Sequence, residues 1–225
     1  MNLLAIETSS PSLSVAIKKR GAKLRHATVK GYMKHAENLL PVIDRLLRKE
    51  RLKLRDIAAF LIARGPGSFT GLRIGFATLK GFLALLPTPC YGAYSLDVIA
   101  AGIPASKSHE ALTVCLDARR GKLYTRSYGF PQRGLAPRGP ACVLSFAEML
   151  QKLPADSLIA GDGVPKIDAS GLTVLPEKSW APQAATLIEL FETKSPLLKK
   201  LTSPRSLLPF YLRSSEAEER LRERK

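Results

Sequence analysis

The sequence is poor in cysteine and histidine and contains no long hydrophobic run. Its three cysteines, Cys90, Cys115 and Cys142, lie far apart, which excludes a disulfide scaffold and argues against a cysteine-ligated zinc site. The longest purely apolar run, Ile57–Ala63, is far shorter than the ~20 residues that a membrane-spanning helix requires. The first residues also lack the basic start of a signal peptide. We therefore expect a protein of the reducing cytoplasm with no membrane partner.

Acidic residues are also few in comparison with basic ones. The 225 residues include 35 Lys and Arg but only 19 Asp and Glu, so the formal net charge is +16. Three stretches are the most basic, namely Lys18–Lys34, Arg45–Arg55 and Arg119–Arg138. Such an excess suggests long-range attraction to an anionic partner, with RNA as the first candidate. A generally basic proteome is the alternative explanation.

The hydrophobic pattern predicts an α/β protein. Hydrophobic residues make up 45% of the chain, which is enough to bury a core and excludes disorder as the main state. Strand-like and helix-like segments alternate through the first hundred residues, and the polar stretch from Gly102 to His109 suggests a boundary. The predicted strands cover residues 3–6, 13–17, 23–29, 57–63, 111–116, 122–128 and 157–160. The predicted helices cover residues 39–49, 72–86, 146–153 and 184–191, with a further short helix after Ser95 and a solvated helix or frayed end from Ser215.

A glycine-rich loop at residues 65–71 is the sharpest local feature. It follows a predicted strand and begins a helix, an arrangement that presents backbone N–H groups to an anion. However, Thr70 stands where a P-loop requires glycine, and no Lys-Ser/Thr pair follows. The favoured interpretation is structural: Ser68 or Thr70 caps the helix, and Gly71 and Gly75 allow another backbone to approach one helix face. Phosphate contact is the alternative.

Polar residues directly follow the first predicted strand. Glu7 could hold Mg²⁺ through water there. No glycine follows it before Gly21, so a phosphate could not approach this backbone closely. The alternative is that Thr8, Ser9 and Ser10 cap a turn.

The remaining polar candidates favour structural roles. His26, His35 and His109 lack the spacing of a two-histidine metal site on one helix. The segment Asp117–Arg119 could form an internal ion pair at a turn. Asp162 could be a turn residue or a ligand contact.

The twelve residues Arg64–Gly75 closely resemble the motif of the TsaB (YeaZ) family, the non-catalytic paralogue of the TsaD threonylcarbamoyltransferase. Further similar segments follow in family order: Leu4–Thr8, His35–Pro41, Asp117–Arg119, Gly161–Gly163 and Pro209–Arg213. The chain departs from the family at Glu7, where aspartate is usual, at Ala36, where serine is common, and in its strong positive charge.

The resemblance implies an actin/hexokinase-like (ASKHA) fold of two domains, each with a mixed sheet flanked by helices. The expected division is residues 1–103, a smaller lobe at 104–203, and a segment at 204–225 that packs back on the first lobe. The implied function is to bind and activate TsaD, together with the TsaE ATPase. That complex forms threonylcarbamoyladenosine next to the anticodon of tRNAs that read codons beginning with A.

The same resemblance implies no catalytic residue and no metal site in this chain. The catalytic relative carries a metal-binding histidine pair where this sequence has Ala93–Ile99, which contains no histidine. ATP or ADP and Mg²⁺ are expected only in the complex with TsaD and TsaE, and tRNA only through that complex.

In this family, two helices pair with equivalent helices of the partner, and a homodimer through the same helices remains open. The predicted interface comprises Leu39, Leu40, Ile43, Leu46, Leu47, Leu72, Gly75, Phe76, Leu79 and Leu83. The family motif loop comprises Arg64, Gly65, Pro66, Gly67, Ser68, Phe69, Thr70, Gly71 and Arg73. The nucleotide or phosphate vicinity, if there is one, comprises Glu7, Thr8 and Ser9.

Two other classes of function compete with this one. The chain could be an independent ASKHA phosphotransferase or peptidase, which the lack of glycine after Glu7 disfavours. It could also be a basic RNA-binding module, in which case it would bind tRNA tightly without a partner.

Overall fold

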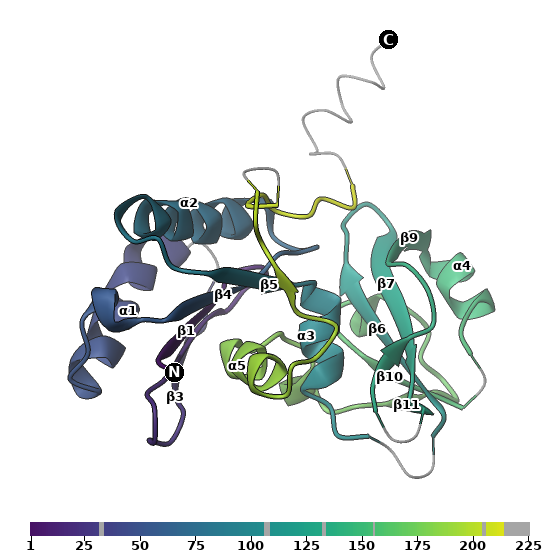
Figure 1. Cartoon of the computed structure of the whole chain (residues 1–225). Coiled ribbons are helices and arrows are strands. Elements are labelled where there is room, and N and C mark those ends of the chain that lie inside the picture. Colours follow the sequence, from purple (N-terminus) through teal and green to yellow (C-terminus); the bar gives the residue numbers. More distant parts are fainter. Residues whose placement is uncertain (32–33, 106–108, 132–133, 155, 204–205, 214–225) are drawn as a thin grey trace, which may run out of the picture.

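The computed structural model describes the chain except residues 32–33, 106–108, 132–133, 155, 204–205 and 214–225, and these described residues form two mixed sheets (Figure 1). In spatial order, the first sheet consists of β12 (Lys199–Lys200), β5 (Cys90–Ala93), β4 (Ala59–Ala63), β1 (Leu3–Glu7), β2 (Leu13–Lys18) and β3 (Arg25–Val29). The second consists of β11 (Thr173–Val174), β10 (Ser157–Ala160), β6 (Ala111–Asp117), β7 (Lys122–Gly129) and β8 (Ala136–Pro137), with β9 (Cys142–Ser145) also paired to β7.

Helices cover both faces of the first sheet. The helices α1 (His35–Lys49) and α2 (Phe69–Leu85) pack on one face, and α5 (Ala184–Glu192) packs on the other. The helix α3 (Ser95–Ala101) lies between the two sheets in Figure 1, and α4 (Phe146–Gln151) packs on β7 and β9 of the second sheet. Single 3-10 turns occur at Leu54–Asp56, Val164–Lys166 and Glu177–Ser179. The α/β class with two helix-flanked mixed sheets is therefore confirmed.

Burial on both faces explains the central strands. Every residue of β1 and β4 is buried, and the two strands pair in parallel with Leu4 opposite Phe60. A parallel strand between two helical layers has no solvent face, so its sequence is continuously apolar rather than alternating. The run Ile57–Ala63 was predicted as a strand on this ground, and the strand is confirmed.

The chain returns to the first sheet after completing the second, which corrects the predicted domain boundary at residue 203. Leu187 and Ile188 of α5 are fully buried in the cluster that contains Leu3 and Leu61 of the first sheet. Further along the chain, β12 pairs with β5 at the edge of that same sheet. The segment from α5 to β12 therefore belongs to the first lobe, because it covers a sheet face that would otherwise be exposed.

The short strands β5, β8, β9, β11 and β12 were not predicted. The predicted helix or frayed end from Ser215 lies outside the described residues. Across the described part of the chain, no helix combines the length and the apolar character needed to cross a membrane.

Candidate functional site

The loop after β1 is directed inward and is hydrogen-bonded within the chain. Glu7 is fully buried, and one of its carboxylate oxygens accepts hydrogen bonds from the Ser9 backbone N–H and the Ser9 hydroxyl, both at 2.5 Å. Its other oxygen accepts one from the Ser10 hydroxyl at 3.1 Å. The Ser95 hydroxyl donates to Ser9 Oγ at 2.7 Å and accepts from the Gly65 N–H at 3.1 Å. These bonds join the end of β1, the glycine loop and the start of α3.

Burial changes the acidity of this site. Desolvation raises the pKa of Glu7 from 4.5 to about 7, and the hydrogen bonds from Ser9 and Ser10 oppose the rise. The carboxylate oxygens of Glu7 are already occupied by groups of the same loop, so the residue does not fit the role of a magnesium ligand. No cluster of three or more potential metal ligands occurs among the described residues.

The glycine motif packs α2 directly onto this loop. A Cβ at Gly67 would overlap the Ser9 carbonyl oxygen, one at Gly71 would overlap the Thr8 carbonyl oxygen, and one at Gly75 would overlap Thr8 Oγ1. Only glycine permits such an approach of a helix to another backbone. This arrangement agrees with the structural interpretation of the motif. The segment that approaches the glycine face of α2 consists of Thr8 and Ser9.

Two further interactions complete the packing of the loop. The Ser68 N–H donates to the Ser9 carbonyl at 2.7 Å, and Ser68 Oγ caps the helix by accepting from the Gly71 N–H at 3.2 Å, as predicted. Thr8 Oγ1 is one of two buried side-chain polar atoms without a hydrogen-bond partner among the described residues, the other being Arg64 Nε. The chain's own helix α2 therefore covers this side of residues 8 and 9.

Eight residues of the predicted partner interface lie in the core of this chain, which corrects that part of the prediction. Their side chains, or the Cα in the case of glycine, cover the first sheet and the loop after β1: Leu39, Ile43, Leu46, Leu47, Leu72, Gly75, Phe76 and Leu79. A residue buried in its own core cannot also present a surface to a partner. Of the other two, Leu83 is half-buried and Leu40 is 53% exposed.

The C-terminal segment of the described chain is tied to the motif loop. The Phe210 N–H donates to the Arg64 carbonyl at 2.7 Å, and a Cβ at Gly65 would lie 2.8 Å from the Phe210 carbonyl oxygen. The ring of Tyr211 stacks on Phe69 with centroids 4.1 Å apart and planes at 6°. The described part of this segment therefore packs on the first lobe, where it covers the start of α2.

The same segment reaches the second lobe. Arg213 donates from Nη1 to the carbonyl of Ala118 at 2.7 Å and to that of Arg119 at 3.0 Å. At this turn Arg119 and Asp117 form the predicted ion pair, at 3.4 Å. Asp162 accepts a hydrogen bond from the Asp117 N–H at 2.9 Å, which gives it a structural role. Burial raises the pKa of Asp162, and the bond from Asp117 opposes the rise.

A buried ion pair joins the two lobes. Asp97 of α3 accepts from Arg126 Nη1 and from the Tyr128 hydroxyl of β7, both at 2.7 Å. Burial raises the pKa of Asp97, opposed by the bond from Tyr128 and by the charge of Arg126. Sequence patterns gave no signal for this contact, because the three residues are brought together only when α3 packs on the second sheet.

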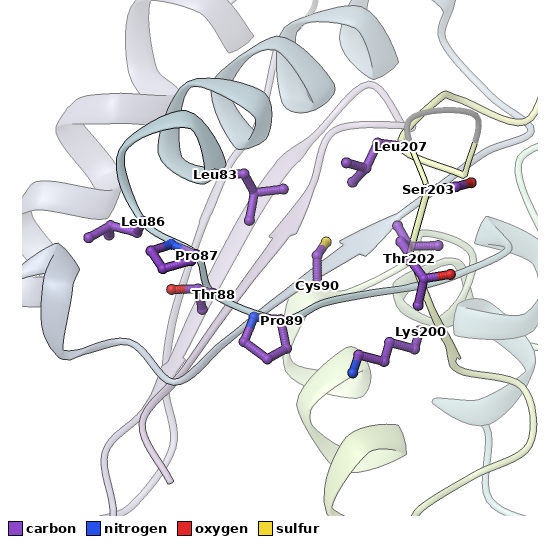
Figure 2. Close-up of a pocket in the computed structure, with 11 residues that line it drawn as sticks. Leu83, Leu86, Pro87, Thr88, Pro89, Cys90, Lys200, Thr202, Ser203 and Leu207 are labelled. Atoms are coloured by element: carbon purple, nitrogen blue, oxygen red, sulfur yellow. The ribbon is translucent and has the colours of Figure 1, made fainter.

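A groove of about 420 Å³ lies between the end of α2, the start of β5, residues 200–203 and Leu207 (Figure 2). Leucine, proline and threonine dominate its lining, and Lys200 is the one charged residue among the lining residues. Burial raises the pKa of the Cys90 thiol in this groove to about 12, so the thiol remains protonated and is a poor nucleophile. The groove therefore offers no pair of groups for acid–base or nucleophilic catalysis.

Comparisons with known proteins identify the family. The family model described as "TsaD: tRNA N6-adenosine threonylcarbamoyltransferase" matches residues 31–219. The TsaB protein of Escherichia coli K12, a "tRNA threonylcarbamoyladenosine biosynthesis protein", is 31% identical over 135 residues, which cover 60% of this chain and 58% of that protein. A Mycobacterium tuberculosis protein is 31% identical over 219 residues, covering 96% of this chain and 93% of its own.

A solved structure supports the same assignment. YeaZ from Pseudomonas aeruginosa superposes with a TM-score of 0.77 at 26% identity, over 94% of this chain and 99% of that one. The match to the curated TsaB proteins is shorter, because the chain spans only 58% and 52% of the first two, from E. coli and Haemophilus influenzae. On the family model, the chain belongs to the TsaD family, and its similarity to the curated TsaB proteins and to YeaZ supports the TsaB (YeaZ) group within it.

Proposed function

We propose that this chain is a scaffold subunit that binds and activates a TsaD-type transferase during formation of threonylcarbamoyladenosine in tRNA. The observation that carries the proposal is the contrast between two parts of the first lobe. The Glu7 carboxylate and the hydroxyls of Ser9 and Ser10 are hydrogen-bonded within the chain, whereas the outward faces of α1 and α2 carry apolar residues without cover. Relatives named for the biosynthesis of this nucleoside support the same conclusion.

The interface that we propose differs from the one predicted from sequence. It uses the outward residues of the two helices: Leu40 and Pro41 of α1, and Ala77, Gly81 and Leu85 of α2, all of which are exposed. Leu40 is 53% and Leu85 is 78% exposed, and the position of a Cβ on Gly81 has no atom within 4 Å. Exposed apolar residues on adjacent helices are typical of an interaction surface.

The non-catalytic role is part of the proposal. Glu7 is turned to its own loop, and the thiols of Cys90 and Cys115 are both raised in pKa to about 12 by burial. We place ATP or ADP and Mg²⁺ on the TsaD- and TsaE-type partners or at their junction with this chain, and the tRNA adenosine that is modified on the TsaD-type transferase. A homodimer through the same faces of α1 and α2 would be the state of the chain without its partner.

The test is co-elution of the chain with the TsaD-type transferase of its organism, followed by measurement of threonylcarbamoyladenosine formed on a tRNA transcript. Gly81→Leu and Leu40→Asp should each abolish co-elution and product, because a bulky group or an unpaired carboxylate would enter a desolvated contact. The chain alone should form no product.

Two matched variants serve as controls. Gly139→Leu adds the same side chain at another exposed glycine with no atom within 4 Å, and Val174→Asp adds the same charge at another exposed apolar residue. Both should leave co-elution intact. Normal complexes with Gly81→Leu and Leu40→Asp would refute this interface, and product from the isolated chain would refute the scaffold role.

A further inference from the structure

Two of the three basic stretches of the sequence come together at one end of the first lobe. Residues 18–25 form the hairpin between β2 and β3, and residues 48–56 connect α1 to β4. Lys19 Nζ donates to the Glu50 carbonyl at 3.0 Å, which ties the hairpin to the end of α1. Asn2 forms a second link, because its side chain accepts from the Arg20 N–H at 2.9 Å and donates to the Asp56 carbonyl at 3.0 Å. We call these two segments together the basic end.

The basic end carries half of the net charge of the protein. Its 17 residues include ten Lys and Arg and two acidic residues, a net charge of +8 within a chain of +16. Both acidic side chains have structural partners. The carboxylate of Glu50 is buried and pairs with Arg25, and that of Asp56 accepts from the Lys53 N–H at 2.7 Å. Lys18 and Arg48 pair with acidic residues outside the two segments, with Glu192 at 3.8 Å and with Asp44 at 2.8 Å. Apart from these two and Arg25, the basic side chains of this end form no ion pair with a described residue.

One arginine of the basic end occupies a backbone conformation that favours glycine. Arg51 follows the end of α1 with φ +55°, where the Leu52 N–H donates back to the Leu47 carbonyl at 2.9 Å. Helices commonly end on glycine in this left-handed conformation, because a side chain there is strained. The sequence places an exposed cation at this position instead, at some cost to the stability of the turn.

We propose that the basic end binds the phosphate backbone of RNA without recognising bases. A surface of like charges repels itself, and binding to a polyanion relieves that repulsion and releases the counterions condensed on the polyanion. The two segments contain no Phe, Tyr or Trp, so they offer no platform on which a base could stack. The choice of RNA among polyanions rests on the proposed function, whose substrate is a tRNA.

The position of this surface leaves the proposed protein interface free. In Figure 1, α2 lies at the top of the first lobe and the β2–β3 hairpin lies at the bottom, beside the start of the chain. An RNA could therefore contact the basic end while the outward face of α2 contacts a protein.

The test uses a quadruple variant of the full chain, Arg20→Gln, Lys23→Gln, Lys53→Gln and Arg51→Gly. All four side chains are exposed, and the glycine also removes the left-handed strain at residue 51, so the variant should fold. Binding is measured by fluorescence anisotropy with a labelled tRNA transcript between 50 and 200 mM KCl (roughly the range over which phosphate contacts are screened). We expect at least a tenfold (~10×) loss of affinity at the lowest salt, and a slope of log K against log [KCl] that is shallower by about 3.

The matched control removes the same charge elsewhere: Lys166→Gln, Lys178→Gln, Lys199→Gln and Lys194→Gly. All four residues are exposed, and Lys194 also has a positive φ of 52°. The control should keep its affinity within about twofold and keep the wild-type slope. Equal losses in the two variants would overturn the proposal in favour of a general effect of net charge, and an unchanged affinity of the first variant would overturn it outright.

Two further readouts separate this proposal from its alternatives. Binding of the wild type to phosphatidylglycerol vesicles but not to the tRNA would overturn it in favour of a membrane contact. Both quadruple variants should still co-elute with the transferase. Loss of RNA binding with intact co-elution supports the proposal, whereas failure of the wild type to co-elute would count against the scaffold function and leave the RNA result standing.

Discussion

The hydroxyl of Ser95 donates a hydrogen bond of 2.7 Å to the hydroxyl of Ser9, 86 residues earlier in the chain. Ser9 in turn donates to Glu7, and Ser95 accepts from the Gly65 N–H. Three segments that approach the same point of the first sheet are thereby fixed relative to one another by buried polar groups. Such a network is stabilising only when each member is satisfied.

Removing the central hydroxyl should therefore destabilise the fold. Ser95→Ala leaves the Gly65 N–H without an acceptor in a buried position, and we expect a loss of about 1–3 kcal/mol in the free energy of unfolding. Urea denaturation followed by circular dichroism measures this value. Ser170→Ala, on the exposed surface, should change it by less than about 0.5 kcal/mol. Equal stability of the two variants would show that the network contributes nothing.

The buried Glu7 predicts a fall in stability with rising pH. The pKa of Glu7 is about 7 in the folded chain and 4.5 in the unfolded chain. Between pH 4.5 and pH 7, the folded state therefore keeps a proton on Glu7 that the unfolded state has lost. The favourable contribution is complete below pH 4.5 and is lost as the pH passes through about 7. From the size of the shift, the total loss is about 3 kcal/mol.

Glu7→Gln removes this titration and should flatten the stability curve between pH 4.5 and 7. The variant should exceed the wild type in stability at pH 8, and the exposed Glu177→Gln should retain the wild-type slope. Chemical denaturation at a series of pH values provides the measurement. A wild-type curve that rises over this interval would contradict the assignment of a raised pKa to Glu7.

Two glycines of α2 should respond in opposite directions to the same substitution. Gly75→Ala places a methyl group against Thr8 Oγ1, and overpacking of this kind costs about 1–3 kcal/mol. Gly81→Ala adds its methyl group in open space on the same helix, where the gain in helix propensity is up to about 1 kcal/mol. Thermal unfolding of the two variants in parallel should give one lower and one higher Tm than the wild type. A Tm above that of the wild type for Gly75→Ala would contradict the close packing of Gly75 on Thr8.

The repeating elements of the fold are accessible from sequence because their signals are local. The continuous apolar run at Ile57–Ala63 indicates a strand covered on both faces, and the structure contains β4 there. The spacing of Gly71 and Gly75 indicates close packing on one helix face, and the segment that packs there contains Thr8. The sequence could not predict which segment packs there, because a glycine indicates only that another part of the molecule lies close to the helix.

The apolar stripe of α1 illustrates the same limit for the candidate interface. Leu39, Ile43 and Leu46 are apolar because they cover the first sheet, but a helix that binds a partner needs apolar residues for the same physical reason. Periodicity shows which face of a helix is buried. It does not show whether the surface that covers this face belongs to the same chain or to a partner. The exposed Leu40 could be separated from its buried neighbours only once the direction of the helix on the sheet was known.

The late return of the chain to the first sheet has a consequence for its synthesis. When β1 to β5 have left the ribosome, one face of their sheet is still uncovered, because Leu187 and Ile188 belong to a helix that is made after the whole second sheet. The edge of β5 pairs with β12 only after Lys199 has been synthesised, and the Arg64 carbonyl gains its hydrogen bond only after Phe210 has been synthesised. The first lobe is thus begun first and finished last. A nascent chain carries an exposed apolar sheet face while the whole second lobe is synthesised, and the second lobe can complete its own fold before the first is closed.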